Sequence, residues 1–540
     1  MNESTFDIVL RNGTVIDGTG TPSRPGDVAV SRGRIAAVGR VTGRGKVEVD
    51  CRGLFIAPGF IDIHSHSDFT IFREPRAVNY VAQGVTLIVS GNCGTSGAPL
   101  DPEDPETAAL LTTHDLREVV TWSTFVEYME ALDRLPKAVN VATLVGFGNV
   151  RAVVMGYGAS RPSRADLEAM KGHVREAMEA GAFGLSTGLI YVPQVFAGFE
   201  EVLEVAKAAG DYGGLYATHL RNESERLIDA VIEAVRVGQA SGLRVQISHH
   251  KVAGRRNWGL VRTALELEEY YRRLGVEVTC DVYPYTAGAT GLSALFPSWT
   301  QRRGREGFLR LLQDPEARER IKADLSRPSP DWENLLYNGG FEGVVFSHSK
   351  VFPEYLGLSL AEVARRRAKD PLEVVLELVA EDFDAGVIIH SMSDDDMRYV
   401  LRHRLSMVAD DGSVVRPGEG CPHPRAYGAF TRVLATYARD EGLLTLEEAV
   451  HKMTGLPAWK LGLEDRGLVR AGVKADLAVF DLWRLGSASE FGDPHHLAEG
   501  MVHVLVNGDF VVRDGRPTGE MPGEVVRRPG TWNGGCRDGL

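Results

Sequence analysis

Alternating apolar and polar residues mark both ends of the chain. In residues 7–50, short strand-like runs are separated by Asn-Gly, Asp-Gly and Arg-Gly pairs, which favour tight turns between strands. The same pattern returns in residues 474–513. We therefore expect the two ends to pair into one small β-domain, formed by residues 1–58 and 471–520. Residues 521–540 should form a loosely ordered tail.

The long middle of the chain follows a different pattern. Short apolar runs alternate with stretches whose apolar residues repeat at helical spacing. Apolar strands between helices are typical of a parallel sheet covered on both faces, and eight such units would close a (β/α)8 barrel of the TIM type. The predicted helices include residues 164–180, 223–241 and 260–274. The predicted strands are residues 59–65, 85–90, 142–148, 182–187, 215–219, 245–249, 276–282, 386–390 and 405–409.

That set holds one strand more than a barrel needs, so one of the late strands should lie elsewhere. A stretch from about residue 293 to 338 also breaks the rhythm, since it is rich in Arg and Pro and helical in pattern. We expect it to form the core of an inserted helical subdomain, residues 293–350. The barrel would then comprise residues 59–292 and 351–470.

Composition places the chain among ordinary globular proteins. Of 540 residues, 44% are hydrophobic and 25% charged, and the formal net charge is −13. No run of Lys or Arg stands out, so nucleic acid and an anionic membrane surface are not expected as partners. We also expect no membrane span and no signal peptide. The five cysteines are an odd number scattered along the chain, which favours a cytoplasmic location over a disulfide framework.

Histidines stand where predicted strands end. The run GFIDIHSH places His64 and His66 two residues apart, so that both imidazoles point to one face of a strand. His219 and His249 end two later strands, in YATH and QISH. His250 must face the opposite side from His249, and we expect it to be structural. Because barrel enzymes carry their chemistry at the C-terminal strand ends, the other four histidines are candidate metal ligands.

A cysteine and two aspartates follow other predicted strands. Cys93 lies in a Gly-flanked loop, and a thiolate is a strong zinc ligand. Most cysteines of this kind are buried free thiols, but the nearby candidate histidines favour a role for Cys93 as a metal ligand. Asp410 and Asp411 end the run MVADDG. One of them should complete the metal site and transfer protons. Asp-Asp-Gly is also a common turn sequence, and position alone does not show which of the two aspartates acts.

The order of these residues resembles the amidohydrolase superfamily. Within it, the chain resembles the D-aminoacylase and N-acyl-D-amino-acid deacylase group, in the motifs SGNCG, GLSTGLIY, THLR, ISHHK, DVYPYTAG and HPRAYGAF. The resemblance covers nearly the whole chain. It implies hydrolysis of the linear amide of a small N-acyl-D-amino acid to a carboxylate and a free D-amino acid.

The resemblance also implies roles for the site residues. A tight zinc would be held by Cys93, His219 and His249. A weaker second site would use the histidine pair at the first strand and an aspartate. The resemblance aligns Asp411 as that aspartate and as the general base and acid, with Asp410 at a position where the group has serine.

Three further residues are candidates for binding the substrate carboxylate. A carboxylate is best met by fixed cationic and hydroxyl donors. The resemblance supports Lys251, Tyr283 and Arg425 in this role. The alternative is ordinary salt bridging at the barrel mouth.

Two other functions fit parts of the pattern. A cyclic amidase of the hydantoinase or dihydroorotase kind usually bridges two metals through a carboxylated lysine on the fourth strand, and residues 182–193 contain no lysine. A non-catalytic metal-binding barrel would be expected to lack a ligand or the base, and none is missing. The acyl group, the amino-acid side chain, the stereospecificity, the number of metals and the oligomeric state stay open.

Overall fold

The two ends of the chain pair into one sheet, as the alternating pattern predicts. The computed structural model describes residues 5–113, 115–329 and 331–530. Strand β18 pairs antiparallel with β5, with Val479 opposite Ile56, and so joins the C-terminal strands to the N-terminal ones. The strands of this terminal sheet are β1 (Thr5–Val15), β2 (Arg24–Ser31), β3 (Arg34–Gly39), β4 (Arg44–Asp50), β5 (Phe55–Pro58), β18 (Leu477–Phe480), β19 (Met501–Val506), β20 (Asp509–Arg513) and β21 (Arg516–Pro517).

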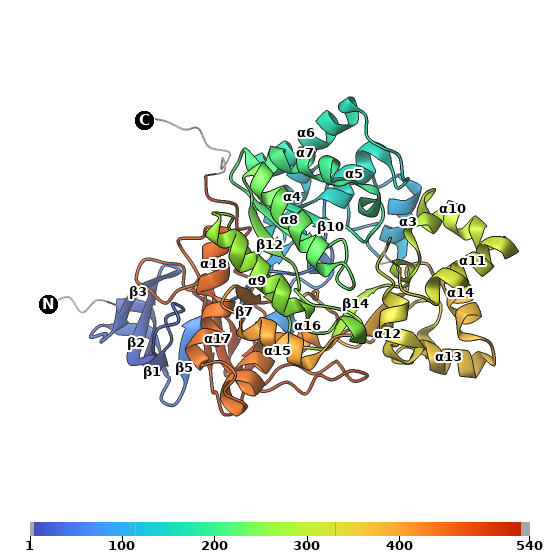
Figure 1. The fold of residues 1–540 in the computed structure, drawn as a ribbon. Coiled ribbons are helices and arrows are strands. Elements are labelled where there is room, and N and C mark those ends of the chain that lie inside the picture. The colour runs from blue at the N-terminus through green and yellow to red at the C-terminus, as the bar shows by residue number, and fades with distance from the viewer. Residues whose placement is uncertain (1–4, 114, 330, 531–540) are drawn as a thin grey trace.

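One face of the terminal sheet is held by apolar residues from both ends of the chain. Ile8 and Leu10 of β1, two positions apart, pack in one core with Leu477 and Val479 of β18. Successive residues of a strand point to opposite faces, so this spacing buries one face of each strand. Figure 1 shows the blue N-terminal strands at one side of the molecule.

Two parallel sheets form the middle of the molecule. Helices of the long α/β region connect their strands, among them α6 (Arg164–Ala180), α7 (Phe199–Gly210), α8 (Leu227–Ser241) and α9 (Leu260–Arg273), which follow one another from the top of Figure 1 to its centre. The three-stranded sheet comprises β6 (Phe60–Asp62), β7 (Val85–Ser90) and β8 (Asn140–Thr143). The six-stranded sheet comprises β9 (Val145–Gly146), β10 (Gly184–Gly188), β11 (Leu215–His219), β12 (Arg244–Ile247), β13 (Val278–Val282) and β17 (Ser406–Val408).

The two parallel sheets approach each other at both edges. Only Leu144 separates β8 from β9 along the chain. At the opposite edges, the backbone N–H of Asp411 donates to His64 O at 2.9 Å, and the N–H of His66 donates to Gly412 O at 2.7 Å. The segments that follow β6 and β17 therefore lie side by side.

The predicted strand 386–390 lies in neither parallel sheet, and its assignment to the barrel is wrong. It forms β16 (Gly386–His390), which pairs antiparallel with β14 (Ala287–Gly291) and β15 (Val344–His348). A short apolar run looks the same in either kind of sheet, so its sequence could not assign it.

The insertion is correspondingly longer than the predicted residues 293–350. A separate hydrophobic core runs from Leu292 to Ile389, so residues 351–389 of the predicted 351–470 segment belong to it. This core lies at the right of Figure 1, away from the terminal sheet. Its helices are α10 (Gly304–Leu311), α11 (Pro315–Leu325), α12 (Leu335–Gly343), α13 (Leu360–Arg367) and α14 (Pro371–Glu381).

The remaining helices connect and cover these sheets. The early ones are α1 (Thr70–Arg73), α2 (Val78–Val81), α3 (Pro105–Thr113), α4 (Phe125–Arg134) and α5 (Phe147–Met155). The late ones are α15 (Asp394–Arg402), α16 (Arg425–Arg432), the π-helical η6 (Val433–Asp440), α17 (Leu446–Met453) and α18 (Gly455–Leu461). Short 3-10 turns are η1 (Gln194–Phe196), η2 (Arg255–Asn257), η3 (Leu292–Leu295), η4 (Ser298–Gln301) and η5 (Pro353–Tyr355).

The start of the predicted tail is ordered. The N–H of Val141 in β8 donates to Glu524 O at 2.9 Å, and the N–H of Val526 donates to Val141 O at 2.8 Å. Residues 524–526 therefore run along β8 rather than loosely. Residues 531–540, including Cys536, lie outside the described residues.

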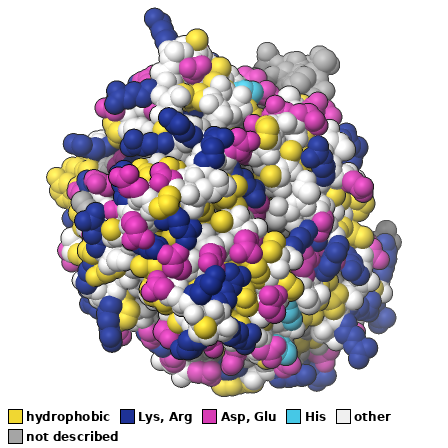
Figure 2. Space-filling model, turned by 90° about the vertical axis from the view of Figure 1, so that its right-hand side faces the viewer, with side chains coloured by type: hydrophobic (Ala, Val, Ile, Leu, Met, Phe, Trp, Pro, Cys, Tyr) yellow, Lys and Arg dark blue, Asp and Glu magenta, His cyan; other side chains and the backbone are white. Residues whose placement is uncertain are grey.

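The surface fits the composition. On the face shown in Figure 2, basic and acidic side chains are interspersed and no extended basic patch occurs. Within the described ranges, none of the helices has the length and apolarity that a membrane crossing requires.

Candidate metal centre

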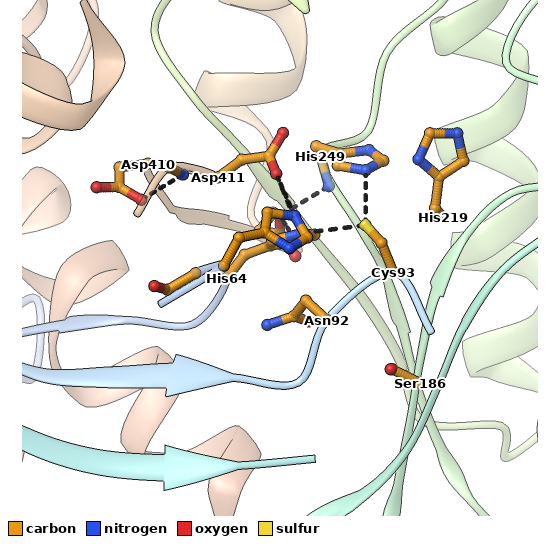
Figure 3. Close-up of polar contacts among 12 residues, drawn as sticks. His64, Asn92, Cys93, Ser186, His219, His249, Asp410 and Asp411 are labelled. Atoms are coloured by element: carbon orange, nitrogen blue, oxygen red, sulfur yellow. Dashed lines mark hydrogen bonds and ion pairs between the residues drawn. The ribbon is translucent and has the colours of Figure 1, made fainter. Parts of the chain in front are cut away.

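Side chains that follow three different strands meet at one point (Figure 3). His64 follows β6, Cys93 follows β7 and His249 follows β12. Cys93 Sγ lies 3.4 Å from Nε2 of His64 and 3.4 Å from Nε2 of His249. All three residues are at most 4% exposed. Sulfur and imidazole nitrogen are the donors that zinc prefers, so this cluster has the chemistry of a zinc site.

A second group of donors shares His64. Oδ1 of Asp411 lies 3.2 Å from His64 Nε2 and 3.1 Å from His66 Nε2. The side chain of His66 is 35% exposed, so this group is more open than the one around Cys93. The predicted histidine pair and Asp411 could therefore hold a metal ion together.

His219 lies at the far side of the same cluster. Its ring centroid is 4.5 Å from that of His249, and the two rings meet edge to face. Although His219 is only 6% exposed, neither ring nitrogen has a hydrogen-bond partner among the described residues. Its Nε2 lies 3.4 Å from Oε2 of Glu223, and these two residues and His249 offer donor atoms within 4.8 Å of one another. Buried imidazole nitrogens are normally hydrogen-bonded, so this arrangement fits a site that a metal ion completes.

The backbone is strained at three of these donors. Cys93, His249 and Asp411 have φ values of 52°, 36° and 50°. Residues with a side chain rarely adopt this left-handed conformation, which costs free energy. Such strain clusters at functional sites, where the surrounding structure holds it in place.

The loop of Cys93 is pressed against β10. Gln194 Nε2 donates to Cys93 O at 3.2 Å, and Gly94 N–H donates to Ser186 Oγ at 3.0 Å. A Cβ atom at Gly188 would lie 2.2 Å from Cys93 O, so only glycine fits this position. The close contact fixes where the thiol points.

Electrostatics keep the Cys93 sulfur charged. Burial favours the neutral thiol, but the imidazoles of His64 and His249 hold the pKa of Cys93 well below its usual range. Burial also favours neutral His64, but the charges of Cys93 and Asp411 raise its pKa well above its usual range. The site thus draws protons onto His64 and His249, although burial lowers the pKa of His219, and a bound cation would take the place of those protons.

Two carboxylates that the sequence analysis did not single out support the histidines. Oδ1 of Asp281 lies 3.2 Å from His64 Nδ1 and accepts the backbone N–H of His249 at 2.7 Å. Oε1 of Glu223 lies 3.1 Å from His249 Nδ1. Carboxylates behind metal-binding histidines fix the orientation of the rings. Asp281 begins the motif DVYPYTAG, and Glu223 lies two residues after the motif THLR. The strand pattern alone predicts no contact for either residue.

The two adjacent aspartates face different surroundings. Oδ2 of Asp411 pairs with Arg425 Nη1 at 2.8 Å, and its other oxygen faces the histidines. Oδ1 of Asp410 instead accepts the N–H of Gly412 at 2.7 Å and the hydroxyl of Tyr80 at 3.1 Å. Burial raises the pKa of Asp410 to about 6. The geometry therefore favours Asp411 for a role in the site.

Two of the three predicted substrate-binding residues line one cavity, and the third lines an adjoining one. Lys251 and Tyr283 line the cavity that also contains Cys93, His219 and His249, here called the central cavity. Arg425 lines an adjoining cavity, which shares His66 and Asp411 with the central one. Its guanidinium carbon lies 4.5 Å from the centre of the Tyr283 ring.

His250 turns away from this site, as its place beside His249 predicts. Its Nε2 lies 3.4 Å from Oε1 of Glu268 on α9, and both residues are at most 1% exposed. Burial, and to a smaller extent the charge of Glu269, raises the pKa of Glu268 to about 8. Burial lowers the pKa of His250 to about 4, so the pair is neutral at pH 7.

Replacing Glu268 with glutamine should make the protein more stable at alkaline pH. The folded state holds the Glu268 proton more tightly than the unfolded chain, whose carboxyl titrates near 4.5. Stability therefore falls as pH rises from that value towards 8, by up to about 1.4 kcal/mol per pH unit. Thermal unfolding at pH 6 and pH 9 should show a smaller loss for Glu268→Gln than for wild type. Glu266→Gln, an exposed change on the same helix, should behave as wild type; equal losses in all three proteins would contradict the burial argument.

Known proteins resemble this chain over nearly its whole length. The model of the amidohydrolase family matches residues 47–292 and 330–512. A D-aminoacylase of Alcaligenes xylosoxydans xylosoxydans is 37% identical over 524 residues, which cover 97% of this chain and 98% of that protein. An N-acyl-D-aspartate deacylase of the same organism is 37% identical, covering 96% and 95%. A crystal structure of an N-acyl-D-glutamate deacylase from Bordetella bronchiseptica, complexed with zinc and a phosphonate inhibitor, is 34% identical and covers 97% of this chain and 100% of that chain, with a TM-score of 0.83.

Proposed function

The chain belongs to the amidohydrolase family, and we propose that it is a zinc-dependent hydrolase that cleaves the amide bond of N-acyl-D-amino acids. The products are a carboxylate and a free D-amino acid. The observation that carries this proposal is the buried Cys93 thiolate, 3.4 Å from Nε2 of His64 after β6 and 3.4 Å from Nε2 of His249 after β12. The substrate class is inferred from the similar deacylases, because the geometry of a zinc site alone does not identify the bond that is cleaved.

We propose that the two parallel sheets form one closed (β/α)8 barrel. With β8 and β9 counted as one strand interrupted at Leu144, the two sheets supply eight parallel strands. The hydrogen bonds between the segments after β6 and β17 join the remaining edges. In such a barrel the side chains after the strands share one mouth, which accounts for the convergence of distant residues.

The donor sets fit one tight and one weaker zinc site. Cys93, His219 and His249 would hold the tight ion, because this set contains the thiolate and each of its residues is at most 6% exposed. His249 links the set, since its donor atoms group with those of Cys93 and His64 and also with those of His219 and Glu223. His64, His66 and Asp411 would hold the weaker one, since this group is more exposed and uses a carboxylate oxygen. Zinc supplies a Lewis acid that polarises the scissile carbonyl and lowers the pKa of water to about 7.

The remaining chemistry is done by side chains of the chain itself. Asp411 takes a proton from the attacking water at Oδ1 and delivers it to the leaving nitrogen, while Arg425 holds its Oδ2. Lys251, Tyr283 and Arg425 meet the carboxylate of the amino acid and fix the orientation of the amide. Asp281 and Glu223 hold the histidine rings from behind.

A cyclic amidase remains the second candidate by family, and the site argues against it. Residues 182–193, which contain β10, offer no lysine that could be carboxylated to bridge two metals. Cys93 stands at the centre of the cluster instead. We also propose a cytoplasmic location, supported by the four cysteines of the described ranges, all of which are free thiols.

A substrate screen tests the function. We expect release of free amine from N-acetyl- and N-formyl-D-amino acids, with kcat/KM at least about 100-fold above that for the L-forms. Hydantoins should be poor substrates, because they lack a free carboxylate for the three proposed binding residues. Amine release can be followed by a colorimetric assay. Turnover of the cyclic compounds alone would identify a cyclic amidase and contradict the proposal.

A further inference from the structure

One buried amide ties the Cys93 loop to the end of a neighbouring strand. Gln194 begins the 3-10 turn η1 and is only 1% exposed. Its Nε2 donates to Cys93 O at 3.2 Å, and its Oε1 accepts the backbone N–H of Gly188 at 2.7 Å. Gly188 is the last residue of β10, so the amide links the loop after β7 to β10.

The backbone packs closely around this amide. A Cβ atom at Gly94 would lie 1.9 Å from Gln194 Oε1, and one at Gly148 would lie 2.8 Å from Gln194 Nε2. The N–H of Gly148, in α5, donates to Gly94 O at 2.8 Å, so these two segments are also joined to each other. Protein interiors are packed as densely as organic crystals, so a shift of the amide would move the Cys93 loop with it.

Cys93 needs such support because its backbone is strained. Its φ of 52° is a conformation that persists only where the surrounding structure holds it. The Gln194 amide holds it at the carbonyl oxygen, and the sulfur then points at the rings of His64 and His249 (Figure 3). Without the amide, the buried carbonyl of Cys93 and the buried N–H of Gly188 would both lose this partner, which favours a rearranged loop.

We propose that Gln194 is a positioning residue, which sets the zinc affinity of the site by fixing the direction of the Cys93 thiolate. This inference rests on the proposed function, in which Cys93 is a ligand of the tight zinc ion. Groups that orient a metal ligand contribute strongly to affinity, and their loss typically weakens metal binding by about 10- to 100-fold.

Replacing Gln194 with methionine tests this role, because methionine has a similar length but no amide. We expect the zinc dissociation constant, measured by competition with a chelator, to rise about 10- to 100-fold. In cobalt(II)-substituted protein, the thiolate-to-cobalt absorption band should shift or weaken, because it depends on the direction of the sulfur. A purely structural role of Gln194 would leave this band unchanged.

Gln83→Met is the matched control. Gln83 is also fully buried, and its amide likewise bridges backbone groups, accepting the N–H of Phe430 at 3.1 Å and donating to Ala426 O at 3.1 Å. These groups are not part of the Cys93 loop. Gln83→Met should therefore bind zinc and cobalt as wild type does, even if it unfolds at a lower temperature.

The outcomes separate the role of Gln194 from the metal centre itself. A folded Gln194→Met with wild-type zinc affinity and cobalt spectrum, or equal losses in Gln194→Met and Gln83→Met, would overturn the role of Gln194. The zinc centre would still stand if Cys93→Ala loses its zinc in the same experiment. A wild type that binds no zinc tightly would overturn both. Circular dichroism establishes folding, and if Gln194→Met does not fold, Gln194→Leu takes its place in the same measurements.

Discussion

Replacing Cys93 with alanine should remove the tightly held zinc and lower kcat/KM by at least about 1000-fold. The thiolate is the one sulfur donor of the cluster, and its contacts with His64 and His249 place it at the centre. The negative charge of the thiolate stabilises a positive charge in the buried site, as the raised pKa of His64 shows. Without the thiolate, a cation there is less stable. Metal analysis after dialysis should give about one zinc per chain for wild type and close to none for Cys93→Ala.

Two further variants make that measurement specific. Cys51→Ala removes another fully buried thiol, in the core of the terminal sheet, and should keep its zinc. His219→Ala should lose the metal as Cys93→Ala does, because both belong to the proposed tight site. Unchanged zinc in both Cys93→Ala and His219→Ala would rule out this site, whatever the chain resembles.

The strand ends were predictable from the sequence because their geometry is local. Histidines two residues apart on a strand must share a face, and an apolar run before them places them at its end. The terminal sheet was predictable for a similar reason, since short strand-like runs at both ends of the chain are separated by Asn-Gly and Asp-Gly pairs. By contrast, β16 pairs with β14 across about a hundred residues, and nothing in a five-residue apolar run specifies its partner.

The supporting carboxylates could not be predicted because they act across the fold. Glu223 was expected at the start of a helix, but α8 begins only at Leu227, so Glu223 stands in the loop and reaches His249. Asp281 lies on β13 and touches His64, more than two hundred residues earlier. The contribution of each depends on which strand ends lie next to each other.

Replacing Asp411 with asparagine should keep the tight zinc and lower kcat by about 1000-fold or more. Burial favours the neutral acid, but Arg425 and His64 hold the pKa of Asp411 well below its usual range. The carboxylate is therefore ionised and able to accept a proton throughout the neutral range. Asparagine keeps the shape and the contact with Arg425 but accepts no proton. Zinc should stay, because the tight site uses Cys93 and two histidines.

Asp410→Asn is the matched control, since it changes the neighbouring carboxyl in the same turn. Asp410 lies against buried Asp62, and burial together with the charge of Asp410 raises the pKa of Asp62 well above its usual range, so the two share a proton. An amide can replace one member of such a pair, and we expect kcat within about tenfold of wild type. A dead Asp410→Asn beside an active Asp411→Asn would reverse the assignment. Then the side chain facing Tyr80, rather than the one facing His66, would be the group that moves the proton.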